Sequence, residues 1–501
     1  MVIFVQTPLN LLGLYKSLFK QTAIYGIATV LPRMLSFLLV PLYTDVLEDN
    51  AAYGEVSVLF AWIVFFNVVL SYGMETAFFR FYSKAEDKEN VISTSTISIF
   101  TTSIIFLIAG LLFQDQLAYL SDKAVHYIVM AIWIIVFDAL VIIPFSKLRA
   151  TGRPMVYAAI KIGNVFINVV LNLFFLLLLP TLAQQNPGSF FDTIYFDNFQ
   201  IGYIFVANLI ASLLTFLFLS PDYFRIKWKF DTALWKTMMI YALPILFAGI
   251  AFAINEHFDK ILLEYLLPEA IAKSETGAYS ACYKIALFMT LFATAFRLGI
   301  EPFFFSHAQS ENAPQTYADI TKYFVIIGSV ILITVIVFAD IIKIFLLQDR
   351  SYWVAMEVVP LIILANFFLG IYANLSVWYK LTDKTKMGAY ISLVGAAVTL
   401  SLNFLLIPYI SYYGSAIATL AAYGSMMVIS YYLGAKHYPI PYDIKKITFY
   451  ITVSSAFSAV YFYGFRENYF VGFPLLLLYL IIIYRMEKQT FYQILGRSSR
   501  S

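Results

Sequence analysis

Charged side chains lie inside long apolar stretches of this sequence, where each needs either a partner or a function. Arg33, Lys161, Lys284 and Arg297 are cations of this kind. A charge at the centre of a membrane-spanning helix costs about 2.5–3.5 kcal/mol on insertion scales, so it must face protein or a water-filled cavity. Guanidinium and ammonium groups in such a cavity suit an anion such as a diphosphate. We therefore expect these four residues to bind the substrate; the alternative is a structural ion pair, for example Arg33 with Asp138.

Amide side chains follow one side of the stretch that contains Lys161. Asn164, Asn168 and Asn172 occur at helical steps of three and four residues, which place them all on one face. Together with Asp138 in the preceding stretch, they are predicted to line a polar pathway. The alternative is that they join neighbouring helices by hydrogen bonds.

Acidic residues near the ends of the apolar stretches form a third group. Glu75 and Glu301 are predicted to form an inner gate or a lobe hinge; the alternative is a charge at a helix end in the membrane interface. Arg297 precedes Glu301 at a spacing that allows an ion pair. Glu256 and Asp259 lie in the cluster NEHFDK and are candidates for an outer gate or a coupling-ion site. An ion-paired helix end is the alternative for this cluster, and Asp259 fits either a cavity or the outer interface.

No catalytic constellation accompanies these residues. The four histidines are scattered, Cys282 is the one cysteine, and no phosphate-binding glycine loop or nucleophile elbow occurs. We therefore expect a protein that is not an enzyme and has no cofactor, metal or nucleic-acid partner. Energy would come from an ion gradient, with H⁺ or Na⁺ as the coupling ion.

The composition predicts the class of fold that must position these groups. Hydrophobic residues make up 61% of the 501 residues and charged residues only 13%, whereas soluble proteins carry about 25% charged residues. The chain is therefore expected to be an all-α polytopic membrane protein. We expect fourteen transmembrane helices, at residues 22–42, 53–79, 91–113, 125–145, 155–180, 201–220, 238–263, 279–301, 323–347, 354–379, 387–407, 414–433, 447–463 and 470–484.

The basic residues predict the direction of these helices. Outside the expected spans, only Lys123, Lys273, Arg350 and Arg466 fall on one side of the membrane, and the other basic residues fall on the opposite side. Because basic residues are enriched on the cytoplasmic side, both termini are predicted to be cytoplasmic.

The sequence contains an internal repeat. Residues 52–81 align without gaps on residues 278–307, and the identical pairs include Tyr53/Tyr279, Gly73/Gly299 and Glu75/Glu301. LNLFFLLLLP at 171–180 similarly resembles LNFLLIP at 402–408. An even number of spans separates the members of each pair, so the two halves are parallel, and duplicated halves are typical of secondary transporters.

The repeat predicts how the chain is organised. We expect two six-helix lobes related by the parallel repeat, followed by two extra helices at the C-terminal end. The predicted segments are an interfacial N-terminus at 1–21, the first lobe at 22–220, a cytoplasmic linker at 221–237, the second lobe at 238–433, helices 13 and 14 at 434–484 and a cytoplasmic tail at 485–501.

Three segments resemble the bacterial polysaccharide-biosynthesis flippases, whose superfamily also holds multidrug exporters and the lipid II flippase. They are LPRMLSFLLVPLYTDVLEDNAAYGEVSVLFA at 31–61, FDKILLEYL with TGAYSACYKIA within 258–286, and LNFLLIPYISYYGSAIATLAAYG at 402–424. The resemblance implies translocation of an undecaprenyl-diphosphate-linked oligosaccharide across the cell inner membrane by alternating access. It also implies a role in O-antigen, capsule or exopolysaccharide synthesis. The implied partners are membrane lipids, a polysaccharide polymerase and a chain-length regulator.

Other functions remain open at this point. A cation-coupled multidrug exporter or a lipid II flippase would have the same fold, and a membrane polysaccharide polymerase or ligase is a further alternative. The intramembrane cations favour an anionic cargo over organic cations. The short outer loops disfavour a polymerase or ligase, because these enzymes usually need a sizeable outer loop for catalysis.

Overall fold

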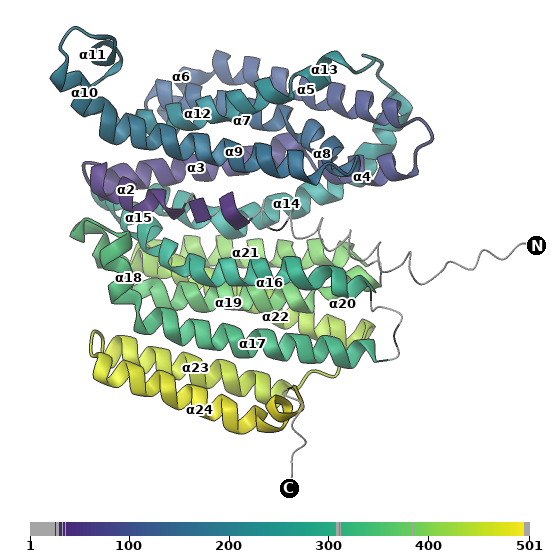
Figure 1. Cartoon of the computed structure of the whole chain (residues 1–501), viewed down its shortest axis with the longest axis vertical. Helices are drawn as coiled ribbons and strands as arrows, with labels where there is room; N and C mark the ends of the chain where they lie inside the picture. The colour runs from purple at the N-terminus through teal and green to yellow at the C-terminus, as the bar shows by residue number, and fades with distance from the viewer. Residues whose placement is uncertain are drawn as a thin grey trace, which may run out of the picture. The chain divides into compact units, whose positions relative to one another are not determined.

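The computed structural model of the chain describes residues 26, 30–32, 34, 35, 37–306, 310, 312–382 and 384–494. The regular structure of these residues is helical and includes no strand. The chain forms two compact units, unit 1 at Met1–Glu264 and unit 2 at Tyr265–Ser501. Their helices run from purple to teal and from teal to yellow in Figure 1. The predicted all-α fold class is confirmed.

The helices have the following bounds. Unit 1 contains α2 (Leu39–Val46), α3 (Asn50–Ser71), α4 (Met74–Lys84), α5 (Lys88–Leu112), α6 (Gln114–Ser121), α7 (Val125–Leu140), α8 (Ile142–Ala150), α9 (Pro154–Leu173), η1 (Phe174–Leu178), α10 (Leu179–Gln185), α11 (Phe190–Ile194), α12 (Gln200–Leu219), α13 (Pro221–Phe224) and most of α14 (Thr232–Leu266). Unit 2 contains α15 (Glu269–Tyr283), η2 (Lys284–Ala286), α16 (Leu287–Ser306), α17 (Ala313–Val337), α18 (Ala339–Leu346), η3 (Arg350–Val358), α19 (Val359–Leu375), α20 (Val377–Leu381), α21 (Lys386–Ile410), α22 (Tyr412–His437), α23 (Ile444–Gly464) and α24 (Tyr469–Ile494).

Twelve helices among the described residues are long and apolar enough to cross a membrane. Helix α23 is not among them, because its serines and threonines lower its mean hydropathy, yet it contacts both α17 and α24 (Figure 1). The first expected span, at 22–42, falls partly outside the described residues. The multi-pass membrane class is confirmed, and the count of fourteen spans stays a prediction.

The compact units do not coincide with the predicted lobes. Helix α14, expected to open the second lobe, lies mostly in unit 1. Its first turn is attached to α5 through Asp231, which accepts a hydrogen bond from the side-chain amide of Asn90 (2.9 Å). The backbone N–H of Leu234 and the Asn90 amide lower the pKa of this carboxyl group. The division into two six-helix lobes stays a prediction, and it concerns which parts of the chain would move as units during transport.

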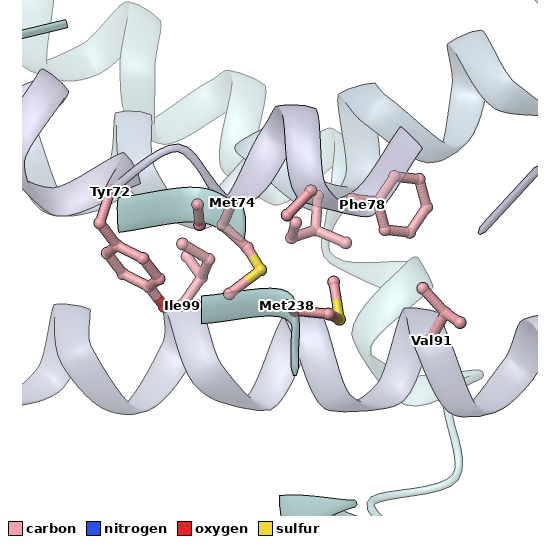
Figure 2. Close-up of a cluster of buried hydrophobic side chains, with 9 residues drawn as sticks. Tyr72, Met74, Phe78, Val91, Ile99 and Met238 are labelled. Atoms are coloured by element: carbon pink, nitrogen blue, oxygen red, sulfur yellow. The ribbon is translucent and has the colours of Figure 1, made fainter. Parts of the chain in front are cut away.

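A left-handed turn breaks the second span of unit 1 between α3 and α4. Tyr72 has φ +32° and Gly73 has φ +73°, a backbone region that favours glycine. A Cβ atom added at Gly73 would lie 2.6 Å from the carbonyl oxygen of Ala242 on α14. Tyr72 packs with Met74 and Met238 in the buried cluster drawn in Figure 2. The absence of a side chain at Gly73 therefore lets α14 pack against this break.

In unit 2, the helix of the matching span is interrupted at a different position. The corresponding span runs as α15, the short 3₁₀ segment η2 and α16, so that the helix is disturbed at Lys284–Ala286. Gly299, the repeat mate of Gly73, lies within α16, and an added Cβ there meets no atom within 4 Å. The repeat that is visible in the sequence therefore does not impose the same backbone geometry on both units.

Polar contacts hold α23 and α24 on unit 2 at both ends. At one end, Asp340 accepts hydrogen bonds from Arg466 (2.8 Å) and Lys343 (2.5 Å). At the other end, the buried carboxylate of Glu487 on α24 forms an ion pair with Lys322 on α17 (3.8 Å) and accepts hydrogen bonds from Lys446 (2.8 Å) and Tyr450 (2.9 Å) on α23. These two helices lie outside the sequence repeat but are fixed to the second unit.

The glycine pair of the repeat provides a test of the helix break. We expect Gly73→Ala to destabilise the protein by about 1–3 kcal/mol, because the new methyl group clashes with Ala242 and strains the left-handed backbone. Gly299→Ala is the matched control and should leave the melting temperature unchanged or raise it. Thermal unfolding of the detergent-purified variants measures both effects. Equal melting temperatures for Gly73→Ala and the parent protein would contradict this account.

Candidate functional site

The structure shows the surroundings of most of the predicted site residues. Arg33 lies outside the described residues, so its role stays a prediction. The other predicted residues fall into a polar cluster inside unit 1, two ion pairs near helix ends, and a group on α14 and α16.

The polar cluster of unit 1 is centred on Asp138 of α7. Its carboxylate accepts hydrogen bonds from the hydroxyl of Ser212 on α12 (2.8 Å) and from the side-chain amide of Asn67 on α3 (3.2 Å). The buried Oδ1 atom of Asn67 has no hydrogen-bond donor among the described residues. Three helices thus surround one carboxylate with oxygen atoms and donors, an arrangement that suits a proton or a small hard cation.

Lys161 on α9 brings a cation to the same interior. Its Nζ atom lies 4.4 Å from the ring centroid of Phe145, and it interacts electrostatically with Asp138, Glu75 and Arg149. The cation–π contact and the carboxylates compensate the ammonium group in a low-dielectric environment. Lys161 and Asp138 therefore belong to one connected group of charges.

The asparagine stripe makes contacts between and within helices. Asn164 donates hydrogen bonds to the hydroxyl of Thr215 (2.9 Å) and to the backbone of α12. Asn172 is fully buried; it donates to Asn168 (2.8 Å to the carbonyl oxygen) and accepts from the hydroxyl of Tyr43 (2.9 Å). These bonds join α9 to α12 and α2. They support helix packing as one role of the amides, and their predicted lining of a pathway remains untested.

The repeated glutamates each form an ion pair inside their own unit. Glu75 on α4 bonds Arg149 on α8 at 2.7 Å, and the same guanidinium lies 4.8 Å from the Phe79 ring. Glu301 on α16 bonds Lys380 on α20 at 2.6 Å. In both units a glutamate of the second span therefore meets a base at the end of a later helix. The predicted role of these glutamates as a gate or hinge stays a prediction.

Arg297 differs from the other intramembrane charges. The sequence spacing suggested a pair with Glu301, but the Glu301 carboxylate bonds Lys380 instead. The Arg297 side chain is exposed and, within the described part of the chain, forms no ion pair. It lines a small pocket with the Glu301–Lys380 ion pair, whose two charges compensate each other, so that Arg297 supplies the net positive charge of the pocket. At 1.5 Å per residue, it lies about 13 Å from the end of α16 at Ser306.

The remaining predicted residues lie on α14 and η2. Asp259 and Lys260 are both buried and form an ion pair at 3.0 Å, beside Glu256 on the same helix. Lys284 begins the 3₁₀ segment η2 and is half-buried. The buried pair shows that Asp259 is not an exposed helix-end charge.

Sequence reasoning missed the partners of these residues. Asn67, Ser212, Arg149 and Lys380 are close to the predicted acids only in the folded chain. The repeat alone gave some indication of these pairs, because two matched glutamates would each need a basic partner within their own half of the chain. The repeat did not predict which basic residue is the partner of each glutamate.

The polysaccharide biosynthesis protein family has a sequence profile that matches residues 18–297 of the chain. That match covers more than half of the 501 residues. A comparison with curated proteins finds no match.

Solved membrane transporters share the fold. The lipid II flippase MurJ in an inward closed conformation is 16% identical, with a TM-score of 0.71 over 95% of this chain and 100% of that one. An outward-facing multidrug resistance MATE family transporter of the MOP superfamily is 13% identical, with a TM-score of 0.59 over 86% and 96%. A MOP superfamily transporter from Pyrococcus furiosus is 14% identical, with a TM-score of 0.56 over 83% and 95%. Because the identities are this low, the structural matches establish the fold alone.

A double-mutant cycle tests the first of the two ion pairs. We expect Glu75→Ala and Arg149→Ala to be non-additive by about 0.2–1 kcal/mol, the range for partly exposed pairs. Melting temperatures of the single and double variants give this coupling. Glu75→Ala combined with Arg80→Ala is the control, because the Arg80 guanidinium instead lies 4.3 Å from the ring centroid of Tyr241. Equal coupling in both cycles would contradict the pairing.

Proposed function

Because the chain belongs to the polysaccharide biosynthesis protein family, we propose that it flips an undecaprenyl-diphosphate-linked oligosaccharide across the inner membrane. The movement would use alternating access between the two predicted six-helix lobes and would supply O-antigen, capsule or exopolysaccharide synthesis. The family and the flippase and transporter fold support this proposal. Both chain termini would lie in the cytoplasm, and a polymerase and a chain-length regulator are the proposed partners.

The observation that carries the proposal is the exposed guanidinium of Arg297. A guanidinium at this depth in an apolar helix must face protein or water. It presents donors in a planar fork that matches diphosphate oxygens, and it gives the pocket a net positive charge because Lys380 there is paired with Glu301. We propose that Arg297 binds the diphosphate of the lipid carrier; Arg33, Lys161 and Lys284 remain predicted substrate-binding cations.

The surroundings of the acids also favour an anionic cargo. Export of organic cations through the predicted site would need the carboxylates of that site to be open to the cargo. Instead, Asp138 accepts hydrogen bonds from its neighbours, and Glu75 and Glu301 each hold a base. Multidrug export is therefore the less supported alternative for this chain, and lipid II remains a related diphosphate-linked cargo.

We further propose that the Asp138 cluster holds the coupling ion. The residues fit a proton or Na⁺, because the carboxylate, the Ser212 hydroxyl and the orphaned Asn67 Oδ1 atom offer oxygen ligands within one buried cluster. A cation there would be compensated by the carboxylate and would compete electrostatically with Lys161. Such competition would make the charge of the Asp138 cluster affect Lys161, which is one of the predicted anion-binding side chains.

Arg297→Ala tests the substrate site. We expect translocation to fall about ten- to hundredfold, since a charge-assisted hydrogen bond contributes about 1.5–3 kcal/mol. Untranslocated lipid-linked oligosaccharide should accumulate on the cytoplasmic face, as measured by its resistance to externally added glycan-labelling reagents. Arg297→Lys should retain part of the activity. Arg225→Ala, which removes an exposed guanidinium outside the spans, is the control and should behave like the parent. Normal translocation by Arg297→Ala would contradict the assignment.

Asp138→Asn tests the coupling site. In proteoliposomes, we expect an imposed H⁺ or Na⁺ gradient to speed translocation by the parent protein but not by this variant, because the amide cannot exchange a proton or compensate a cation. Asp115→Asn is the control, since Asp115 is exposed outside the spans. If Asp138→Asn responds to both gradients as the parent does, the coupling ion binds elsewhere.

A further inference from the structure

A second pocket lies in unit 2, at the opposite helix ends from the Glu301–Lys380 pair. Its volume is about 520 Å³, within the range of about 300–1,000 Å³ for small-molecule sites. It is formed where α21 turns into α22, beside α15. The residues that line it are Glu275, Ile410, Ser411, Tyr412, Tyr413 and Ile417. None of them belongs to the proposed diphosphate or coupling-ion sites.

A strained residue builds the turn at the pocket. Ser411 alone connects α21 to α22 and has φ +49°, a left-handed conformation that a non-glycine residue adopts at a cost. Its hydroxyl donates a hydrogen bond to the carboxylate of Glu275 on α15. Gly414 allows the close return of the chain, because a Cβ there would lie 2.8 Å from the backbone of Leu406. The turn thus holds Glu275 at the pocket wall.

Two tyrosine rings form the adjoining wall. The rings of Tyr412 and Tyr413 stack with centroids 5.1 Å apart at 27°. The Tyr412 hydroxyl donates to the carbonyl oxygen of Val354 (3.1 Å), and the Tyr413 hydroxyl donates to the carboxylate of Glu357. Tyr463 donates to the carbonyl oxygen of Glu357 (2.8 Å). These hydrogen bonds orient the rings before any ligand arrives.

The chemistry of these walls matches a sugar. A pyranose has hydroxyl groups that donate to carboxylates and a C–H face that packs on aromatic rings, and Glu275 and the tyrosine pair offer both. The carboxylates Glu275 and Glu357 would repel a sugar acid. The same groups would favour a neutral sugar or an aminosugar.

We propose that this pocket binds a neutral sugar or aminosugar residue of the translocated oligosaccharide at the predicted outer face. The assignment rests on the proposed function for the identity of the glycan. The basic residues predict that this end of unit 2 is the outer one, so the pocket would receive the glycan after translocation. It would thereby select glycans by charge at the step where they leave the protein.

Saturation-transfer NMR on the purified full-length protein in nanodiscs tests the pocket. The probes are maltotetraose and chitotetraose, which are neutral, and tetragalacturonate, which is anionic. We expect saturation transfer to at least one neutral probe and none to tetragalacturonate. Glu275→Gln and Tyr413→Ala should each weaken binding at least about tenfold, with the parent's melting temperature retained by Glu275→Gln. Tyr409→Ala is the matched control, because Tyr409 is 82% exposed and does not line the pocket.

The outcomes separate this proposal from the proposed function. Absence of transfer to both neutral probes, equal binding of tetragalacturonate, or unchanged binding by both pocket variants would overturn the pocket assignment. Because probe binding requires no transport, these results do not depend on the diphosphate site. If Arg297→Ala translocates normally while the neutral probes still bind at Glu275 and Tyr413, the proposed diphosphate site fails and the pocket stands.

Discussion

The cost of a charge in the membrane is the constraint on which the rest of this structure depends. Each charged side chain within an apolar helix must be compensated by protein or reach water. Asp138 is compensated by hydrogen bonds, Asp259 by the adjacent Lys260, and Glu75 by Arg149. Most of these contacts join different helices, so the interactions that compensate the charges also hold the helices together. Arg297 stands apart, because its side chain is exposed and forms no ion pair within the described part of the chain; this is the basis for proposing that it binds the anionic cargo.

The ion pairs that compensate several of these charges each lie within one compact unit. The two matched glutamates bind bases of their own units, and the ends of α23 and α24 are held by charges within unit 2. A unit built in this way keeps its buried charges compensated through a movement that leaves it intact. The Glu75–Arg149 and Glu301–Lys380 pairs also each lie within one predicted six-helix lobe, so they would be retained if whole lobes moved in alternating access.

Much of this organisation could be predicted from the sequence, because membrane helices leave strong local signals. Hydropathy gave the class, and Glu75 and Glu301 revealed the repeat. The partners of the charges could not be predicted, since Arg149 and Lys380 come close to their glutamates only through tertiary packing. The helix breaks could not be predicted either: Gly73 and Gly299 match in the sequence, yet of the two only Gly73 adopts a left-handed conformation and lies against a carbonyl group that leaves no room for a side chain.

The choice between an anionic lipid cargo and an organic cation tests the account most directly. Purified protein in liposomes can be given either a fluorescent undecaprenyl-diphosphate-linked sugar or a fluorescent organic cation, with an ion gradient imposed. The account predicts protein-dependent movement of the diphosphate-linked lipid to the other leaflet, and no movement of the cation above that of protein-free liposomes. Transport of the organic cation without movement of the lipid would contradict it.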